Sequence, residues 1–195
     1  MDLTFFSPLT RNGIEKSVKI SEVLKKLNID NIYSSPYIRT LQTVYPYSKD
    51  RKLPIKLDYS LTELYQSDNI PKKSYSVTLP EYIAESFNYD DSYTSSIKPT
   101  EIEFPESISN FKKRVKSFLN DIIINNHKSN KSIILVTHQG VINIINNIIQ
   151  KSKISNIDKN LDENSNIKED EFNYPKGAIT KIFEDNKWTF EKINW

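Results

Sequence analysis

The fold is indicated most clearly by the stretch Ser132-Ile133-Ile134-Leu135-Val136-Thr137-His138-Gln139-Gly140. Its apolar run has the length of a β-strand, and a run that is apolar at every position is typical of a parallel strand covered on both faces. A glycine follows, and residues 141–149 then have the composition of a buried helix. A strand that leads directly into a helix is the repeating unit of α/β proteins.

A second junction of the same kind lies near the N-terminal end. Residues 31–34 form a short strand candidate, and Ser35-Pro36 reads as an N-cap followed by a proline at the first helical position. The helix that follows is expected to run to about Val44, before Pro46. Thr10 is expected to cap an earlier helix, from about Asn12 to Leu27.

The remaining elements complete the same pattern. We predict a strand at 53–61, a short helical stretch at 79–86, an amphipathic helix at 106–126 and a hairpin formed by 178–183 and 188–193. Strands that alternate with helices indicate a three-layer α/β/α fold with a mostly parallel sheet and an antiparallel edge at the end. Residues 1–195 are expected to form a single domain.

Two segments are expected to be loops. Residues 67–106 contain four prolines, at 71, 80, 99 and 105, and they form either a substrate loop or a solvated insertion. Residues 151–173 are polar and are expected to form a flexible loop.

Composition excludes several classes of function. With 27 basic and 25 acidic residues, the formal charge of +2 gives no electrostatic footprint for nucleic acid. The chain has no cysteine and two histidines, which excludes thiolate zinc sites and argues against a His-rich metal site. Residues 1–6 do not resemble a signal peptide, and no apolar run is long enough to span a membrane, so a cytoplasmic protein is expected. The oligomeric state stays open.

Arg39 is the first candidate site residue. It lies in the opening turn of the predicted second helix, where the partial positive charge of the helix terminus disfavours a cation. An anion bound there would resolve that conflict through the backbone N–H groups and the guanidinium. The alternative is a surface arginine paired with a nearby carboxylate.

His138 is the second candidate. It lies at the carboxyl end of a buried strand, the usual ligand position in open α/β sheets, and Gly140 lets the backbone approach a ligand closely. The alternative is a structural histidine. Because both junctions are expected at the same edge of the sheet, Arg39 and His138 would converge on an oxyanion, for which phosphate is the commonest choice.

Glu63 is the third candidate, since it follows a predicted strand closely. A partly buried carboxyl group there would serve as a proton donor to a leaving alcohol. The alternative is a surface carboxylate.

These motifs together resemble the histidine phosphatase superfamily, with its phosphoglycerate mutase-like fold. Residues 34–43 are similar to the family's Ser-Ser-Pro-x-x-Arg-x-x-Gln-Thr segment, 8–13 to its Pro-Leu-Thr-x-x-Gly segment, and 137–140 to its second histidine motif. Residues 175–195 resemble its closing strands. Within the family, the chain is most similar to the eukaryotic-type branch of tyrosine and steroid-phosphate phosphatases. The segments that carry this similarity are 55–58, 61–63, 87–93, 105–107 and Arg114. Phosphoglycerate mutase activity is therefore the less favoured alternative.

The resemblance implies a phosphoric monoester hydrolase that acts on a phosphorylated small molecule or phosphoprotein without a metal or cofactor. A histidine attacks phosphorus, and water then hydrolyses the phosphohistidine. Arg39 and His138, with Gln139 and Gly140, would bind the phosphate, and Glu63 would protonate the leaving group.

One departure from the family bears on activity. The family's nucleophile is the histidine of an Arg-His-Gly motif at the end of a first strand, which should precede Pro8. Seven residues precede Pro8 in this sequence, and none is histidine or glycine. Three hypotheses follow: an N-terminally truncated enzyme whose first strand is missing, a non-catalytic relative that binds phosphorylated ligands, and a decayed protein without activity.

Overall fold

A computed structural model describes residues 7–65, 78–128, 131–151, 175–185 and 187–193. The predicted flexible loop at 151–173 lies outside these residues apart from Lys151, which ends a helix. Residues 66–77, which include the start of the predicted loop at 67–106, also lie outside them.

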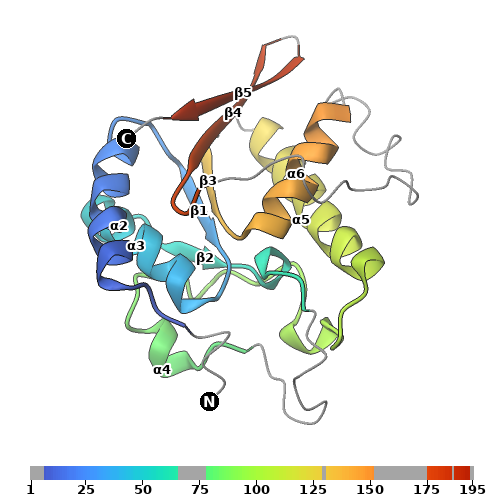
Figure 1. Cartoon of the computed structure of the whole chain (residues 1–195), viewed down its shortest axis with the longest axis horizontal. Coiled ribbons are helices and arrows are strands. Elements are labelled where there is room, and N and C mark those ends of the chain that lie inside the picture. Colours follow the sequence, from blue (N-terminus) through green and yellow to red (C-terminus); the bar gives the residue numbers. More distant parts are fainter. Residues whose placement is uncertain (1–6, 66–77, 129–130, 152–174, 186, 194–195) are drawn as a thin grey trace.

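The centre of the protein is a parallel sheet of three strands, β1 (Asn31–Ser34), β2 (Ile55–Leu57) and β3 (Ile133–Val136), in the order β2-β1-β3. Ile32 of β1 pairs with Ile55 on one side and with Ile134 on the other. The strands β4 (Ile179–Asp185) and β5 (Lys187–Ile193) form a separate antiparallel pair beside it (Figure 1).

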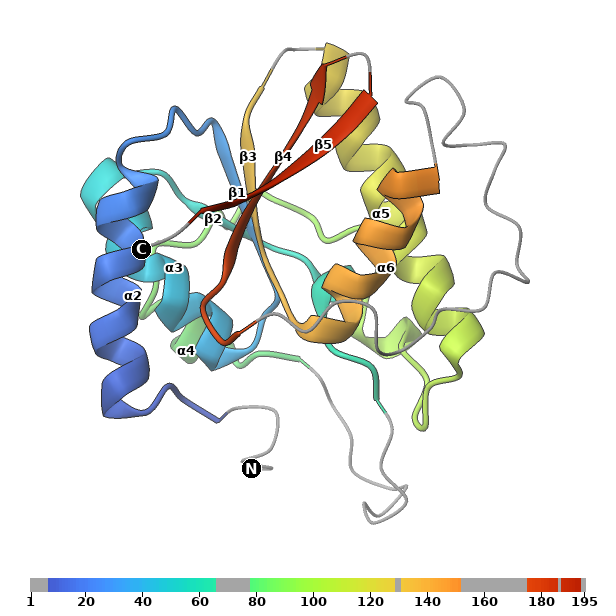
Figure 2. The ribbon, with the colours of Figure 1, turned by 45° about the horizontal axis from the view of Figure 1, so that its top comes forward.

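Helices cover both faces of the sheet, which confirms the three-layer α/β/α prediction. The helices α2 (Arg11–Leu24), α3 (Ile38–Arg51) and α4 (Glu81–Ala84) lie on one side, and α5 (Ile108–Lys128) and α6 (Gln139–Lys151) lie on the other (Figure 2). Two single-turn helices, η1 (Tyr59–Leu61) and η2 (Pro99–Glu101), lie in the connections. No helix in the described ranges combines the length and the apolar composition needed to cross a bilayer.

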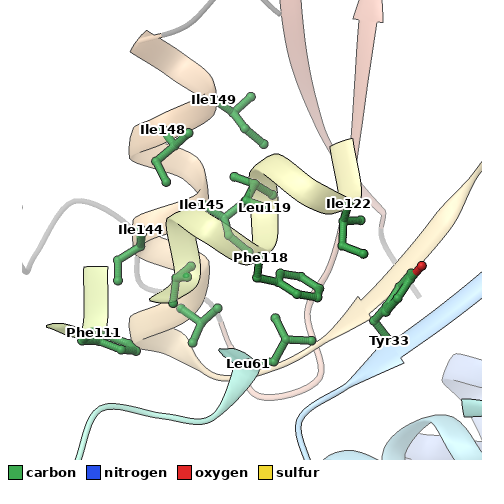
Figure 3. Close-up of a cluster of buried hydrophobic side chains, with 12 residues drawn as sticks. Tyr33, Leu61, Phe111, Phe118, Leu119, Ile122, Ile144, Ile145, Ile148 and Ile149 are labelled. Carbon is green, nitrogen blue, oxygen red and sulfur yellow. The ribbon is translucent and has the colours of Figure 1, made fainter. Parts of the chain in front are cut away.

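Successive side chains of a strand point to opposite faces of the sheet, so they pack into two different hydrophobic cores. In β1, Ile32 joins the core under α2 and α3, whereas Tyr33 joins the core under α5 and α6. Figure 3 shows the second core, in which Phe118 of α5 is fully buried. Its ring packs edge-on against that of Tyr33, with the ring centroids 5.8 Å apart.

The bounds of α3 differ from the prediction at both ends. The helix begins at Ile38 with Tyr37 as its N-cap, so Ser35 is not the cap, and it continues through Pro46 to Arg51. A proline inside a helix costs about 3 kcal/mol because one backbone hydrogen bond is lost. Tyr47, which follows the proline, is 2% exposed, and burial of its aromatic ring offsets part of that cost.

One connection also differs in detail from the prediction. The strand predicted at 53–61 ends at Leu57, because the Asp58 carboxylate accepts from Ser60 N at 2.8 Å and starts η1. The same buried carboxylate accepts from the Tyr93 hydroxyl at 2.7 Å and from Ser96 N at 2.9 Å. Asp58 therefore ties the segment around residue 95 to the end of the sheet. Thr10 caps α2 as predicted, and accepts from Gly13 N at 3.2 Å.

The two edges of the parallel sheet are covered differently. At the β2 edge, Ile55 N donates to Asn88 O at 2.7 Å and Asp90 N donates to Ile55 O at 2.8 Å. Within the described residues, β3 pairs with β1 alone. In β4, however, Ile179 packs on the core under α2 and α3, and Ile182 packs on the core under α5 and α6. The strand β4 therefore lies between the two helical layers, as the parallel sheet does, although it has no hydrogen-bonded ladder to β3.

Truncation of Phe118 tests the core under α5 and α6. Phe118→Ala is expected to lower the free energy of unfolding by about 3–5 kcal/mol, since a fully buried phenylalanine leaves a cavity. Tyr82→Ala, in α4, is the control, because Tyr82 is 65% exposed. Urea denaturation of both variants measures the difference, and equal losses would contradict this description of the core.

Candidate functional site

The candidate site is formed where β1 leads into α3 and β3 leads into α6. The two strands are parallel neighbours, with Ser34 in register with Val136, so their carboxyl ends meet at one edge of the sheet. Ser35 N donates to Val136 O at 2.9 Å just beyond the strands, which joins the two junctions directly.

Arg39 and His138 are in contact across this edge. The distance between Arg39 Nη2 and His138 Nδ1 is 3.3 Å, and His138 Nε2 lies 2.9 Å from Ser35 Oγ. A guanidinium can only donate hydrogen bonds, so Nδ1 is the acceptor and the proton of a neutral ring lies on Nε2, which donates to Ser35. The structure thus brings together the two residues that the sequence analysis singled out for phosphate.

No carboxylate lies within 4.0 Å of the Arg39 guanidinium in the part of the chain that the structure describes. The guanidinium instead lies over the ring of Tyr37, with Cζ 4.4 Å from the ring centroid. The alternative of a surface arginine paired with a carboxylate is therefore not what the described residues show. Glu63 acts on the charge of Arg39 through space and without an ion pair, so the guanidinium can still donate to an anion.

His138 is neutral in this arrangement. It is 8% exposed, and burial lowers the pKa of its imidazole to about 3, assisted by the positive charges of Arg39 and Arg114. Burial also lowers the pKa of Arg39, although a guanidinium keeps its proton at any ordinary pH.

Glu63 is tied to the same junction through its carboxylate. Oε2 accepts from Gly140 N at 3.2 Å, and Oε1 accepts from Leu64 N at 3.0 Å. A side chain at position 140 would overlap Glu63 Oε1 and come within 3.2 Å of the Phe111 ring, so the carboxylate occupies space that only a glycine leaves open. The predicted acid thus contacts Gly140 at the start of α6, two residues along the chain from His138.

Gln139, which was expected to contact the phosphate, has a hydrogen bond within its own helix, and the phosphate contact stays a prediction. Its side-chain amide Nε2 donates to Asn143 Oδ1 at 2.8 Å, one turn further along α6. Gln42, from the same motif as Arg39, accepts from Leu9 N at 2.6 Å and so anchors the segment before α2.

Arg114 is a residue of this region whose role the sequence analysis missed. It is 6% exposed and binds the buried carboxylate of Glu106 through Nε–Oε1 at 2.6 Å and Nη2–Oε2 at 2.8 Å. Its other N–H groups donate to the carbonyl oxygens of Ser60, Thr62 and Glu63 at 2.7, 2.9 and 3.2 Å. All five donors are used, and they fix the backbone that carries Glu63.

A signal for Arg114 was present in the sequence. Residues 111, 114, 115 and 118 follow the spacing of one helix face, so an arginine stands among the apolar residues that α5 buries. A buried charge needs a partner, and Glu106 lies just before the helix.

Comparison with known proteins identifies the family and the fold of the chain. The family model of the histidine phosphatase superfamily (branch 1) matches residues 7–185. No curated protein matches the chain. The sequence analysis predicted this superfamily, and the family match confirms it.

Solved structures show the same fold. The ecdysone phosphate phosphatase from Bombix mori, in complex with tungstate, has a TM-score of 0.67 at 16% identity, over 96% of this chain and 71% of that chain. An alpha-ribazole phosphatase from Shigella flexneri has a TM-score of 0.61 at 17% identity, over 96% and 84%. A phosphoglycerate mutase from Bacillus anthracis has a TM-score of 0.54 at 20% identity, over 95% and 81%. The phosphoglycerate mutase-like fold is thereby established.

The neutral state of His138 predicts a pH dependence of stability. As pH falls from about 6.5 towards 3, the unfolded chain gains a proton at this residue that the folded chain does not, so the free energy of unfolding decreases. His138→Gln removes this contribution, and its stability is expected to fall less steeply than that of the wild type over the same window. Denaturation at a series of pH values measures both slopes, and identical slopes would show that His138 is not held neutral.

Proposed function

The chain belongs to the histidine phosphatase superfamily, and we propose that its domain hydrolyses phosphate monoesters through a phosphohistidine, with Arg39 and His138 binding the phosphate group. The substrate in this proposal is a phosphorylated small molecule or a phosphoprotein. The proposal rests on the family, on the geometry of the two strand-to-helix junctions and on the charge gathered there.

The observation that carries the proposal is the contact of Arg39 with a neutral His138 at the start of α3. The guanidinium forms no ion pair with a carboxylate of the described residues, although the charge of Glu63 acts on it through space. It lies in the first turn of α3, whose N-terminus adds partial positive charge. A phosphate would find the donors of the Arg39 guanidinium and a helix terminus there, a combination suited to a dianion. The single N–H of the neutral His138 ring, which donates to Ser35 in the free protein, would have to turn to the ligand.

Each group has a defined part in the proposed reaction. Arg39 donates to the phosphoryl oxygens and stabilises the negative charge that they carry in the transition state. His138 contacts the same oxygens from the other junction when its Nε2–H exchanges Ser35 for the phosphate. Glu63, held by Gly140 N and Leu64 N, protonates the leaving oxygen and later accepts a proton from the attacking water.

The nucleophile must come from another histidine. The sequence contains two histidines. His138 forms, with Arg39, the proposed phosphate-binding pair, which we call the phosphate grip, and His127 lies towards the end of α5. We propose that a strand on the N-terminal side of Pro8 supplies it within the family's Arg-His-Gly motif. The β3 edge supports this step, because β3 and β4 flank the same two cores without pairing to each other.

A non-catalytic phospho-ligand-binding protein is the second candidate function. It is favoured by one observation: the residues 1–195 contain Arg39, His138 and Glu63 but no histidine that matches the family's nucleophile. Phosphate binding is common to both candidates, whereas turnover distinguishes them.

Phosphate binding is tested by thermal unfolding in the presence of inorganic phosphate. At a concentration 100 times Kd, a ligand specific for the folded state stabilises it by about 2.7 kcal/mol, and each kcal/mol raises the Tm of a chain of this size by about 2–4 °C. We expect this rise for the wild type and its loss in Arg39→Ala. Arg51→Ala, in the last turn of the same helix, is the matched control and should respond like the wild type. A wild type that does not respond, or an Arg39→Ala variant that responds fully, would refute the proposed site.

Turnover is tested with the genomic sequence upstream of Met1. The enzyme hypothesis predicts in-frame codons for a hydrophobic strand followed by Arg-His-Gly, and the extended protein is expected to hydrolyse p-nitrophenyl phosphate. Replacement of the histidine in that motif by alanine should abolish hydrolysis and leave phosphate binding in place. An in-frame stop codon directly before Met1 would contradict the enzyme hypothesis and favour the binding protein.

A further inference from the structure

We propose that Tyr37 is a positioning residue of the phosphate grip. Its ring packs against the side chains of Arg39 and His138, in a place where a carboxylate could otherwise pair with Arg39. This inference rests on the proposed function, because it explains how the grip is held ready before phosphate arrives. It concerns a residue that lies between the serine-proline pair and the arginine of the motif.

One ring contacts both members of the grip. The Arg39 guanidinium lies over the Tyr37 ring at 4.4 Å from Cζ to the centroid. The His138 ring lies 4.7 Å from the same ring, centroid to centroid, at an interplanar angle of 58°. The 3.3 Å contact between Arg39 Nη2 and His138 Nδ1 is thus made by two groups that share a single aromatic support.

The support is itself fixed at both ends. The Tyr37 hydroxyl donates to the Tyr65 hydroxyl at 2.6 Å, and the two residues are 3% and 2% exposed. At the backbone, Tyr37 O accepts from Thr40 N at 3.0 Å and from Leu41 N at 3.1 Å as α3 begins. The hydroxyl contact and the start of the helix together fix the orientation of the Tyr37 ring. The fixed ring in turn restricts the side chains of Arg39 and His138 that lie against it.

An aromatic ring does this without neutralising the cation. The negative face of a ring attracts a guanidinium by about 0.5–2 kcal/mol, depending on desolvation. A carboxylate in the same place would form an ion pair with Arg39 and would compete with the phosphate for its donors. Tyr37 thus lowers the conformational entropy that Arg39 loses on binding, and it leaves the positive charge for the ligand.

The test compares Tyr37→Phe, which keeps the ring, with Tyr37→Leu, which removes it. In calorimetric titration with inorganic phosphate, Tyr37→Phe should bind within about twofold of the wild type. Tyr37→Leu should bind about 2–30-fold more weakly, which corresponds to the loss of a cation–π contact. Tyr37→Met, with an unbranched side chain, replaces the leucine variant if that variant does not fold.

Tyr47→Leu is the matched control for packing. Tyr47 is 2% exposed, lies in the same helix and belongs to the core under α2 and α3. It should lose stability and keep the phosphate affinity of the wild type. Wild-type affinity in a folded Tyr37→Leu variant, or an equal loss of affinity in Tyr47→Leu, would overturn the proposal.

A readout without ligand separates this inference from the proposed function. Nitrogen-15 NMR spectra of the imidazole rings should show His138 of the wild type as a single tautomer with its proton on Nε2. Tyr37→Leu should give a mixture of tautomers, because Arg39 no longer stays against Nδ1. If the wild type does not bind phosphate, the proposed function fails, and the tautomer still decides the role of Tyr37: a single unchanged tautomer in Tyr37→Leu refutes it.

Discussion

The candidate site depends on the parallel pairing of β1 with β3. Because Ser34 is in register with Val136, the helices that follow the two strands start side by side, and Arg39 meets His138 although 98 residues separate them in sequence. A slip of this register would separate the two side chains and reverse the faces of the strands, so that Ile32 and Tyr33 would exchange cores. The packing that stabilises the fold is therefore the same packing that aligns the site.

Sequence reasoning predicted the strands, the layers and the positions of Arg39, His138 and Glu63, since apolar periodicity and strand-to-helix junctions are local signals. It placed the α3 cap at Ser35 and ended the helix before Pro46, because local rules weigh a proline without knowing that Tyr47 is buried beyond it. The supporting roles of Arg114 and Tyr37 depend on contacts with distant segments. Arg114 reaches the carbonyls of Ser60, Thr62 and Glu63, and Tyr37 reaches Tyr65.

In the proposed function, the described residues form a phosphate-binding half-site with an acid beside it. Arg39 supplies charge, His138 is held neutral by burial, and Glu63 lies at the start of α6 where a glycine leaves room for it. Two kinds of support keep these groups in place: the Arg114–Glu106 pair fixes the backbone of Glu63, and the Tyr37 ring fixes the side chains of the grip. Within the described residues β3 pairs with β1 alone, and its other edge is where the proposed histidine-bearing strand would pair.

The central claim is that Arg39 and His138 bind one phosphate between them. A crystal structure of the protein grown with tungstate, a heavy analogue of phosphate, tests it most directly because the metal atom locates the anion without ambiguity. We expect one tungstate with oxygens within hydrogen-bond distance of Arg39 and His138. The distance between Arg39 Nη2 and His138 Nδ1 should then be longer than the present 3.3 Å. Tungstate bound elsewhere, with the arginine and histidine still in contact, would contradict it.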